Sequence, residues 1–110
     1  MHPERAEEFW TSVSRMFELS GQGKDDDALA LAIRMRDEFT ERPAETNYLV
    51  ATLYARTGHP SKTIETFESA LEAGMAWNEA LLRRSPSLAS LQEHPRFEAI
   101  VTRSGELSSS

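Results

Sequence analysis

Apolar residues recur every three or four positions through most of the 110-residue chain, which is the spacing of one face of an α-helix. Glycine and proline divide this pattern into segments. The first segment predicts a helix that begins at Pro3 and ends before Gly21 and Gly23. Its apolar face consists of Ala6, Phe9, Trp10, Val13, Met16 and Phe17. No stretch shows the convincing alternation of a β-strand, so we predict an all-α protein.

Three further helices follow from the same pattern. The second is expected to begin near Asp25, whose side chain can accept a hydrogen bond from a free backbone N–H, and to end before Pro43. The third is predicted over about residues 44–57, and the fourth runs from Pro60 to Gly74. These helices are long enough to form antiparallel pairs.

After Gly74 the pattern weakens. Residues 75–84 are predicted to form two or three turns, and a single short turn is expected near Leu88 and Leu91. Pro95 then opens a last short helix, and residues 105–110 are expected to form a flexible tail. We therefore expect a single domain, residues 1–104, followed by that tail.

The chain also repeats with a period of 35 residues. Gly23 and Gly58 are separated by this step, and each follows one predicted helix and precedes another. The same step relates the dipeptide His59-Pro60 to His94-Pro95. A fixed period of this length indicates stacked helical pairs, in which each pair covers the apolar face that its neighbour leaves open.

One period carries a large and then a small apolar residue, an aromatic, the turn glycine, and then small, aromatic and small positions. These are Val50, Ala51, Tyr54, Gly58, Thr63, Phe67 and Ala70. In this order they resemble a tetratricopeptide (TPR) repeat, with Thr63 in place of the usual alanine. The first unit matches at Gly23, Ala28 and Ala32.

The C-terminal part carries a second ordered set: Gly74, Trp77, Leu81, Leu82, Pro86, Leu88, Leu91, Pro95, Arg96, Phe97, Ile100 and Val101. It resembles the ending of many bacterial TPR-containing proteins, which we interpret as a cap over the last helix face. The resemblance implies an α-α superhelix of stacked antiparallel hairpins. Repeat 1 would cover about residues 3–42, repeat 2 about 43–74, and the degenerate cap 75–104.

Composition narrows the function classes. The chain has 12 Lys and Arg against 18 Asp and Glu, a formal net charge of −6, and no cysteine. Disulfides, thiolate zinc sites and cysteine nucleophiles are therefore excluded. An acidic chain without a basic cluster is a poor nucleic-acid binder. The longest uncharged run, residues 46–55, is too short to cross a membrane, so we expect a cytoplasmic protein with neither membrane nor nucleic acid as partner.

Catalytic and metal motifs are not found in the sequence. His2, His59 and His94 lack the spacing of metal ligands, and the run Asp25–Asp27 lacks the alternation and glycine of a calcium loop. The serines do not occur in a G-x-S-x-G turn, and no glycine-rich phosphate loop follows a strand. We expect no catalytic residues, no metal and no cofactor, and hence not an enzyme.

The TPR resemblance implies that the first helix of each pair lines a concave groove. Repeat alignment places on it Trp10, Val13, Phe17, Glu45, Tyr48, Thr52 and Arg56. We expect this groove to bind a peptide or helix of a partner protein. The Lys and Asn residues with which some TPR grooves hold a terminal carboxylate are replaced here by Val13, Phe17 and Tyr48, so such recognition is not expected.

Three alternatives to this interpretation stay open. In the first alternative, the apolar residues of the first helix belong to the core. In another, they form a homodimer interface on the side that no preceding repeat covers. In the third, the chain is the regulatory C-terminal segment of a larger enzyme.

Overall fold

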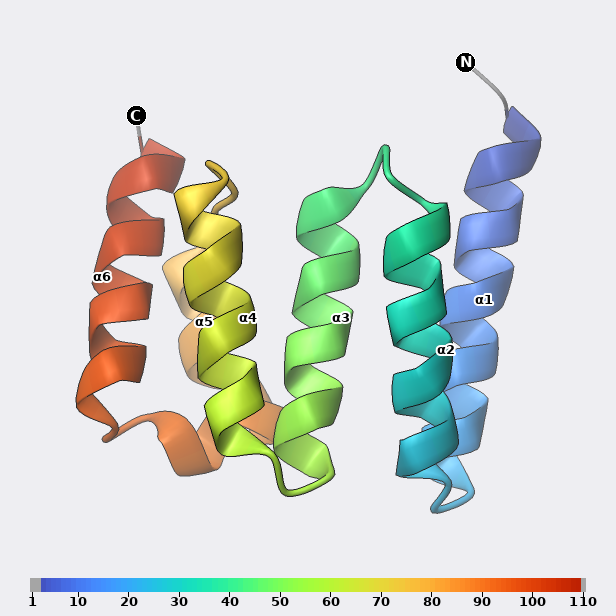
Figure 1. Ribbon diagram of the computed structural model, residues 1–110, viewed down its shortest axis with the longest axis horizontal. Coiled ribbons are helices and arrows are strands. Elements are labelled where there is room, and N and C mark those ends of the chain that lie inside the picture. Colours follow the sequence, from blue (N-terminus) through green and yellow to red (C-terminus); the bar gives the residue numbers. More distant parts are fainter. Residues whose placement is uncertain (1–2, 110) are drawn as a thin grey trace.

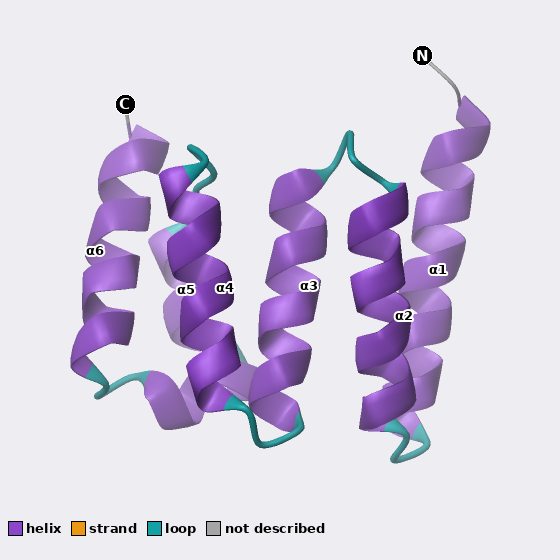
Figure 2. Ribbon diagram, in the orientation of Figure 1, coloured by secondary structure: helices purple, strands orange, loops and turns teal. Residues whose placement is uncertain are grey.

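The computed structural model describes residues 3–109, and the side chains of residues 6–108. Over this range the chain forms seven helices and no strand (Figures 1 and 2), which confirms the all-α prediction. They are α1 (Pro3–Gly21), α2 (Asp25–Glu38), α3 (Pro43–Arg56), α4 (Pro60–Glu72), α5 (Glu79–Arg84), the 3₁₀ helix η1 (Pro86–Leu91) and α6 (Pro95–Ser109). Two of the residues named above, His2 and Ser110, lie outside this range.

The first four helices pack in chain order. α1 packs on α2, α2 on α3, and α3 on α4, and successive helices run in opposite directions (Figure 1). Short connections enforce this arrangement, because they leave no length for a crossover. α1 and α3 therefore point the same way along the molecule, as do α2 and α4.

The two hairpin turns have the same backbone geometry, 35 residues apart. Gly23 and Gly58 adopt left-handed φ angles of 78° and 83°, which residues other than glycine rarely adopt. In both turns the residue after the glycine donates its N–H to the carbonyl five positions earlier: Lys24 to Leu19 and His59 to Tyr54, each at 2.8 Å. The same geometry also ends α4, where Gly74 has φ of 91° and Met75 donates its N–H to the Ala70 carbonyl at 3.0 Å.

Small buried residues allow the helices to approach closely. Ala28 and Thr63 occupy equivalent positions one period apart, and both are fully buried. The Thr63 hydroxyl donates to the carbonyl of Ala51 at 2.9 Å, so its burial leaves no unpaired polar atom. Between α4 and the C-terminal helices, the buried ring of Phe67 meets Trp77 edge-on at 5.1 Å between centroids.

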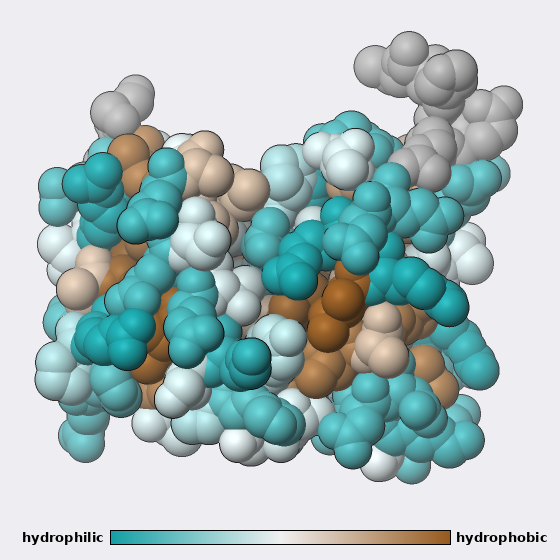
Figure 3. Space-filling model, in the orientation of Figure 1, coloured by the Kyte–Doolittle hydropathy of each residue, from teal (hydrophilic) through white to brown (hydrophobic). Residues whose placement is uncertain are grey.

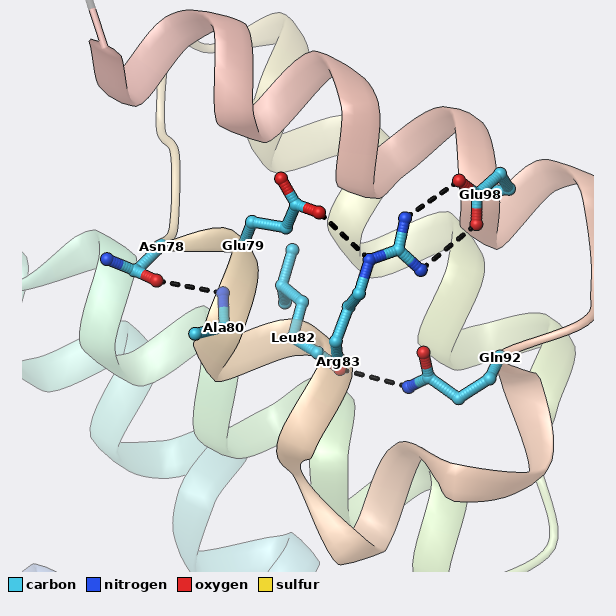
Figure 4. A network of polar contacts seen from close by, with 7 residues as sticks. All are labelled: Asn78, Glu79, Ala80, Leu82, Arg83, Gln92 and Glu98. Carbon is cyan, nitrogen blue, oxygen red and sulfur yellow. Dashed lines mark hydrogen bonds and ion pairs between the residues drawn. The ribbon is translucent and has the colours of Figure 1, made fainter.

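Polar contacts hold the C-terminal segment against the rest of the structure. The Ser104 hydroxyl of α6 accepts the Trp77 N–H at 2.6 Å and donates to the Trp77 carbonyl at 2.7 Å. The indole N–H of Trp77 donates to the carbonyl of Ala44 in α3 at 2.9 Å. Nearby, Arg83 of α5 bonds both Glu79 and Glu98 (Figure 4). These bonds join the loop before α5 to α3 and α6, and they join α5 to α6.

Two expectations are corrected at the helix ends. The predicted tail at residues 105–110 is helical through Ser109, because Ser104 is fully buried and Leu107 packs against the C-terminal core. Asp25 does not cap α2: the cap position is Lys24, and no side chain bonds the free backbone N–H groups there. The Asp25 carboxylate instead accepts from the Ser20 hydroxyl at 2.6 Å.

Candidate functional site: an apolar groove across α1, α3 and α5

A hollow of about 460 Å³ lies between α1, the first turns of α3, and the segment that leads into α5. It is lined by Phe9, Trp10, Val13, Phe17, Ala44, Glu45, Tyr48, Leu49, Trp77 and Leu81. A second hollow of about 300 Å³ shares Phe17, Tyr48 and Leu49 with it and continues toward the last turn of α3 and the start of η1. Its other lining residues are Met16, Ser20, Thr52, Leu53, Arg56, Ser85, Pro86 and Ser87. We call the two hollows together the groove.

The groove contains all seven residues that repeat alignment placed on one surface. Trp10, Val13 and Glu45 line the first hollow, Thr52 and Arg56 line the second, and Phe17 and Tyr48 line both. In Figure 1, α1 lies behind α2 and α5 lies behind α4. Figure 3 shows the near face, where hydrophilic side chains predominate around two apolar areas, one between α2 and α3 and one between α4 and α6.

The groove differs from the rest of the described surface in that it contains exposed large hydrophobic side chains. Among the described side chains, the large hydrophobic ones that are exposed are Trp10 (54%), Phe17 (62%) and Leu81 (44%). All three line the first hollow. Val13 beside them is buried, whereas Tyr48 and Thr52 are half-buried and Glu45 and Arg56 are exposed. A scattered exposed apolar residue is ordinary, but three gathered in one concavity are typical of an interaction surface.

Trp10 is held in place by its neighbours. Its ring meets the ring of buried Phe9 edge-on at 5.1 Å, and Phe9 in turn packs edge-on against Phe39 of the loop after α2 at 5.4 Å. The guanidinium of Arg42 lies 4.8 Å from the Phe9 ring centre and 5.8 Å from that of Trp10. These contacts favour a single orientation of the indole while leaving about half of it open.

Opposite charges mark the two ends of the groove along α3. Glu45 lies in the first turn and pairs with Arg42 at 3.1 Å, and Arg56 is the last residue and pairs with Asp25 at 3.3 Å. The Ser20 hydroxyl bond, aided by the Arg56 charge, holds the pKa of Asp25 below its ordinary 3.8. The Asp25 carboxylate therefore stays ionised at neutral pH and fixes Arg56 at this end.

Sequence reasoning missed part of the lining. Ala44 and Leu49 lie on the same side of α3 as Tyr48, and Trp77 and Leu81 come from the C-terminal segment. Leu81 and Leu82 are adjacent in sequence, yet Leu82 is fully buried and Leu81 is exposed. The 35-residue period could not place Trp77 and Leu81 in the groove. Trp77 precedes α5, and α5, which contains Leu81, has only six residues and does not match the longer helices on which the alignment rests.

The histidines within the described range have local partners. His59 and His94 each precede the proline that opens a helix. The His59 Nδ1 lies 3.0 Å from the Thr57 hydroxyl, and the His94 Nδ1 accepts the Arg96 N–H at 3.2 Å. Over the described residues, no group of three His, Cys, Asp or Glu side chains is placed to hold a metal ion. None of the described helices has the length and apolar character needed to cross a membrane.

The groove is thus an apolar hollow with one charged residue at each end and no cluster of chemically reactive groups among its lining residues. Comparison of the chain with protein-family models, with curated proteins and with solved structures finds no match.

Proposed function

We propose that this protein is a non-catalytic, cytoplasmic interaction module whose groove binds a peptide or helix of a partner protein. The observation that carries the proposal is the gathering of Trp10, Phe17 and Leu81 in one concavity, where each stays exposed. Truncating Trp, Tyr and Arg at interfaces usually costs the most binding energy. The groove offers Trp10, Tyr48 and Arg56.

The proposal includes a TPR-like architecture, with two repeats over about residues 3–42 and 43–74 and a degenerate C-terminal cap. Its support is the repeated turn at Gly23 and Gly58, together with parallel α1 and α3 that line the same groove. The C-terminal part departs from a third repeat. α4 packs along α6, and α5 packs against α6 and η1.

The side of α1 that faces away from the other described helices carries charged residues. This favours groove binding over a homodimer on that side. One period later, the corresponding positions of α3 are Val50 and Leu53, which are buried against the first helical pair. In α1 these positions are Arg15 and Glu18, which are exposed and lie 3.6 Å apart as an ion pair. We therefore expect light scattering at micromolar concentration to give the mass of one chain.

The test is capture of a partner from extract of the native cells, followed by measurement of its affinity for variants. Tyr48→Ala and Tyr54→Ala form a matched pair, because both tyrosines are half-buried on α3 and only Tyr48 is among the residues that line the groove. We expect Trp10→Ala and Tyr48→Ala each to weaken binding by about tenfold or more, and Tyr54→Ala to change it by less than about threefold.

Circular dichroism shows whether each variant keeps its helices. A partner that binds folded Trp10→Ala and Tyr48→Ala protein as tightly as the unaltered chain would rule out the groove as the binding surface.

A further inference from the structure

We propose that the first hollow of the groove is an anchor site for one uncharged aromatic side chain of the partner, and that the second hollow bonds polar groups of the same segment about 10 Å away. This inference rests on the proposed function of the groove and adds the chemistry of the segment that it binds. Both an extended and a helical segment can carry such a pair of groups.

Aromatic rings form much of the first hollow. Five of its ten lining residues are aromatic: Phe9, Trp10, Phe17, Tyr48 and Trp77. Trp10 and Phe17 are exposed, so a ring that enters the hollow covers apolar surface that now faces solvent. Contact between two aromatic rings adds about two- to tenfold in affinity beyond the effect of the buried area. The lining therefore favours an aromatic side chain over an aliphatic one.

The charges at the first hollow are balanced. Glu45 is the one charged residue among its lining residues, and it is paired with Arg42 at 3.1 Å. The guanidinium of Arg42 also lies 4.8 Å from the centre of the Phe9 ring. A charged side chain of either sign would therefore lose water here without meeting an unpaired counter-charge. Charge complementarity thus selects an uncharged side chain.

The second hollow has a more polar lining. Four of its eleven lining residues are serine or threonine: Ser20, Thr52, Ser85 and Ser87. Ser20 and Thr52 already donate to groups of the chain itself, and Arg56 is held in an ion pair. Ser85 is the cap residue of η1, but its side chain makes no capping bond there. We assign the half-buried hydroxyls of Ser85 and Ser87 to polar groups of the bound segment.

The two hollows are close enough for one segment to reach both. Glu45 lines only the first hollow and Thr52 only the second, whereas Tyr48 lies between them on α3 and lines both. Glu45 and Thr52 are seven positions apart, which corresponds to two helical turns or about 10 Å along the axis. This span is the expected separation between the anchored ring and the bonded polar groups.

Blocked amino acids test the first hollow, because they present one side chain without charged termini. The full chain is titrated with the N-acetyl amides of phenylalanine, leucine and lysine, and the indole N–H signal of Trp10 is followed by NMR. We expect the phenylalanine amide to bind about two- to tenfold more tightly than the leucine amide. The lysine amide should leave the signal unshifted.

A charge added beside the hollow tests the selection against charged side chains. Leu81 lines the hollow and is 44% exposed, so Leu81→Glu adds a carboxylate without opening the core. We expect this variant to bind the lysine amide and to bind the phenylalanine amide about threefold more weakly or less. Leu81→Lys gives the converse test with the glutamate amide.

The matched control is Ala80→Glu. Ala80 is exposed on the same helix, α5, and is not among the residues that line the groove. The control therefore changes the net charge equally, and it should keep the amide preference of the unaltered chain.

A peptide tests the second hollow. It is selected on the immobilised full chain from a phage-displayed library of random peptides of about ten residues, which span both hollows in either conformation. We expect the selected peptides to carry an aromatic residue. The double variant Ser85→Ala, Ser87→Ala should bind them about tenfold more weakly. It should bind the phenylalanine amide unchanged, because the amide fills only the first hollow. Ser90→Ala, exposed on η1 outside the groove lining, serves as the control.

Three results would overturn the inference: a phenylalanine amide that binds no more tightly than the lysine amide, an unchanged amide preference in Leu81→Glu, or unchanged peptide affinity in the serine double variant. Binding of the phenylalanine amide without any enriched peptide would overturn it as well, and would assign the hollow to a free aromatic molecule. A dimer that dissociates on Trp10→Ala would assign the groove to a second copy instead.

The proposed function can survive the failure of this inference. If selected peptides without an aromatic residue still lose affinity against Trp10→Ala, the groove binds a partner segment and only the aromatic anchor is wrong. If selected peptides bind folded Trp10→Ala protein unchanged, the proposed function fails as well.

Discussion

At the scale of single residues, one hydroxyl fastens the loop before α5 to α6. Ser104 is fully buried and makes two bonds to Trp77, one to its N–H and one to its carbonyl. Removing the hydroxyl would leave both backbone groups buried without this partner. Since Trp77 also packs on Phe67 and lines the groove, its position links the stability of the C-terminal segment to the site.

We predict that Ser104→Ala lowers the free energy of unfolding by about 2–3 kcal/mol, because buried unpaired backbone groups are costly. The control is Ser108→Ala on the same helix, where the serine is exposed and its hydroxyl donates to the Gly105 carbonyl at 3.3 Å. We expect the control to stay within about 0.5 kcal/mol of the unaltered chain. Urea unfolding measures both, and equal losses would refute the role given to Ser104.

At the scale of elements, the turn between α1 and α2 depends on one left-handed glycine. Gly23 has φ of 78°, whereas Gly21 ends α1 in ordinary helical geometry, and a Cβ at either position would meet no atom within 4 Å. Space is therefore equal at the two sites, and only the backbone conformation differs.

We predict opposite effects of alanine at these two positions. Gly23→Ala should cost about 1–2 kcal/mol of unfolding free energy, since the left-handed conformation is unfavourable for a residue with a Cβ. Gly21→Ala should be neutral or stabilise by up to about 1 kcal/mol, since alanine favours helix. Thermal unfolding of the two variants gives the comparison, and destabilisation of similar size in both would contradict it.

An ion pair between α4 and α6 makes part of the stability depend on pH. Arg96 donates to Glu68 through Nε at 3.1 Å and Nη2 at 2.5 Å, and this bond holds the pKa of Glu68 below its ordinary 4.5. A carboxylate whose pKa is lowered by folding stabilises the native state above its unfolded pKa. That contribution is lost as pH falls through the unfolded and then the folded value.

We therefore predict that Glu68→Gln is less stable than the unaltered chain at neutral pH, and that the two converge between about pH 5 and pH 3. The effect is small because the Glu68 side chain is 40% exposed. Glu72→Gln, one turn later and exposed, serves as the control. A stability difference for Glu68→Gln that persists unchanged at low pH would show that the ion pair is not its cause.

Helix beginnings could be predicted from sequence better than helix ends. Prolines open α1, α3, α4 and α6, because proline fits the first turn without losing a bond. α6 continues past Gly105, which local preference disfavours, because Ser104 and Leu107 gain tertiary contacts that no local pattern encodes. Asp25 was predicted as a cap from its residue type, but its carboxylate is engaged by Ser20 and Arg56 from other elements.

At the scale of the whole molecule, the period predicted the part of the groove that α1 and α3 supply. The alignment grouped seven residues of α1 and α3, and these residues line the two hollows. Trp77 and Leu81 could not be assigned in this way, because the C-terminal segment breaks the period with two short helices in place of one long one.

The fluorescence of the two tryptophans can report whether the groove is occupied. Both line the groove, but Trp10 is 54% exposed and Trp77 is 6% exposed. Acrylamide should therefore quench the Trp10 emission strongly and the Trp77 emission weakly, and Trp10→Phe should remove the quenched component.

The most direct test of the groove as a binding surface is acrylamide quenching of the chain with and without its captured partner or selected peptide. Binding in the groove predicts that the Trp10 component becomes protected and shifts to shorter wavelength at saturation, while the quenching of Trp77, which is 6% exposed before binding, changes little. A saturated complex in which acrylamide quenches Trp10 as strongly as in the free chain would contradict the account.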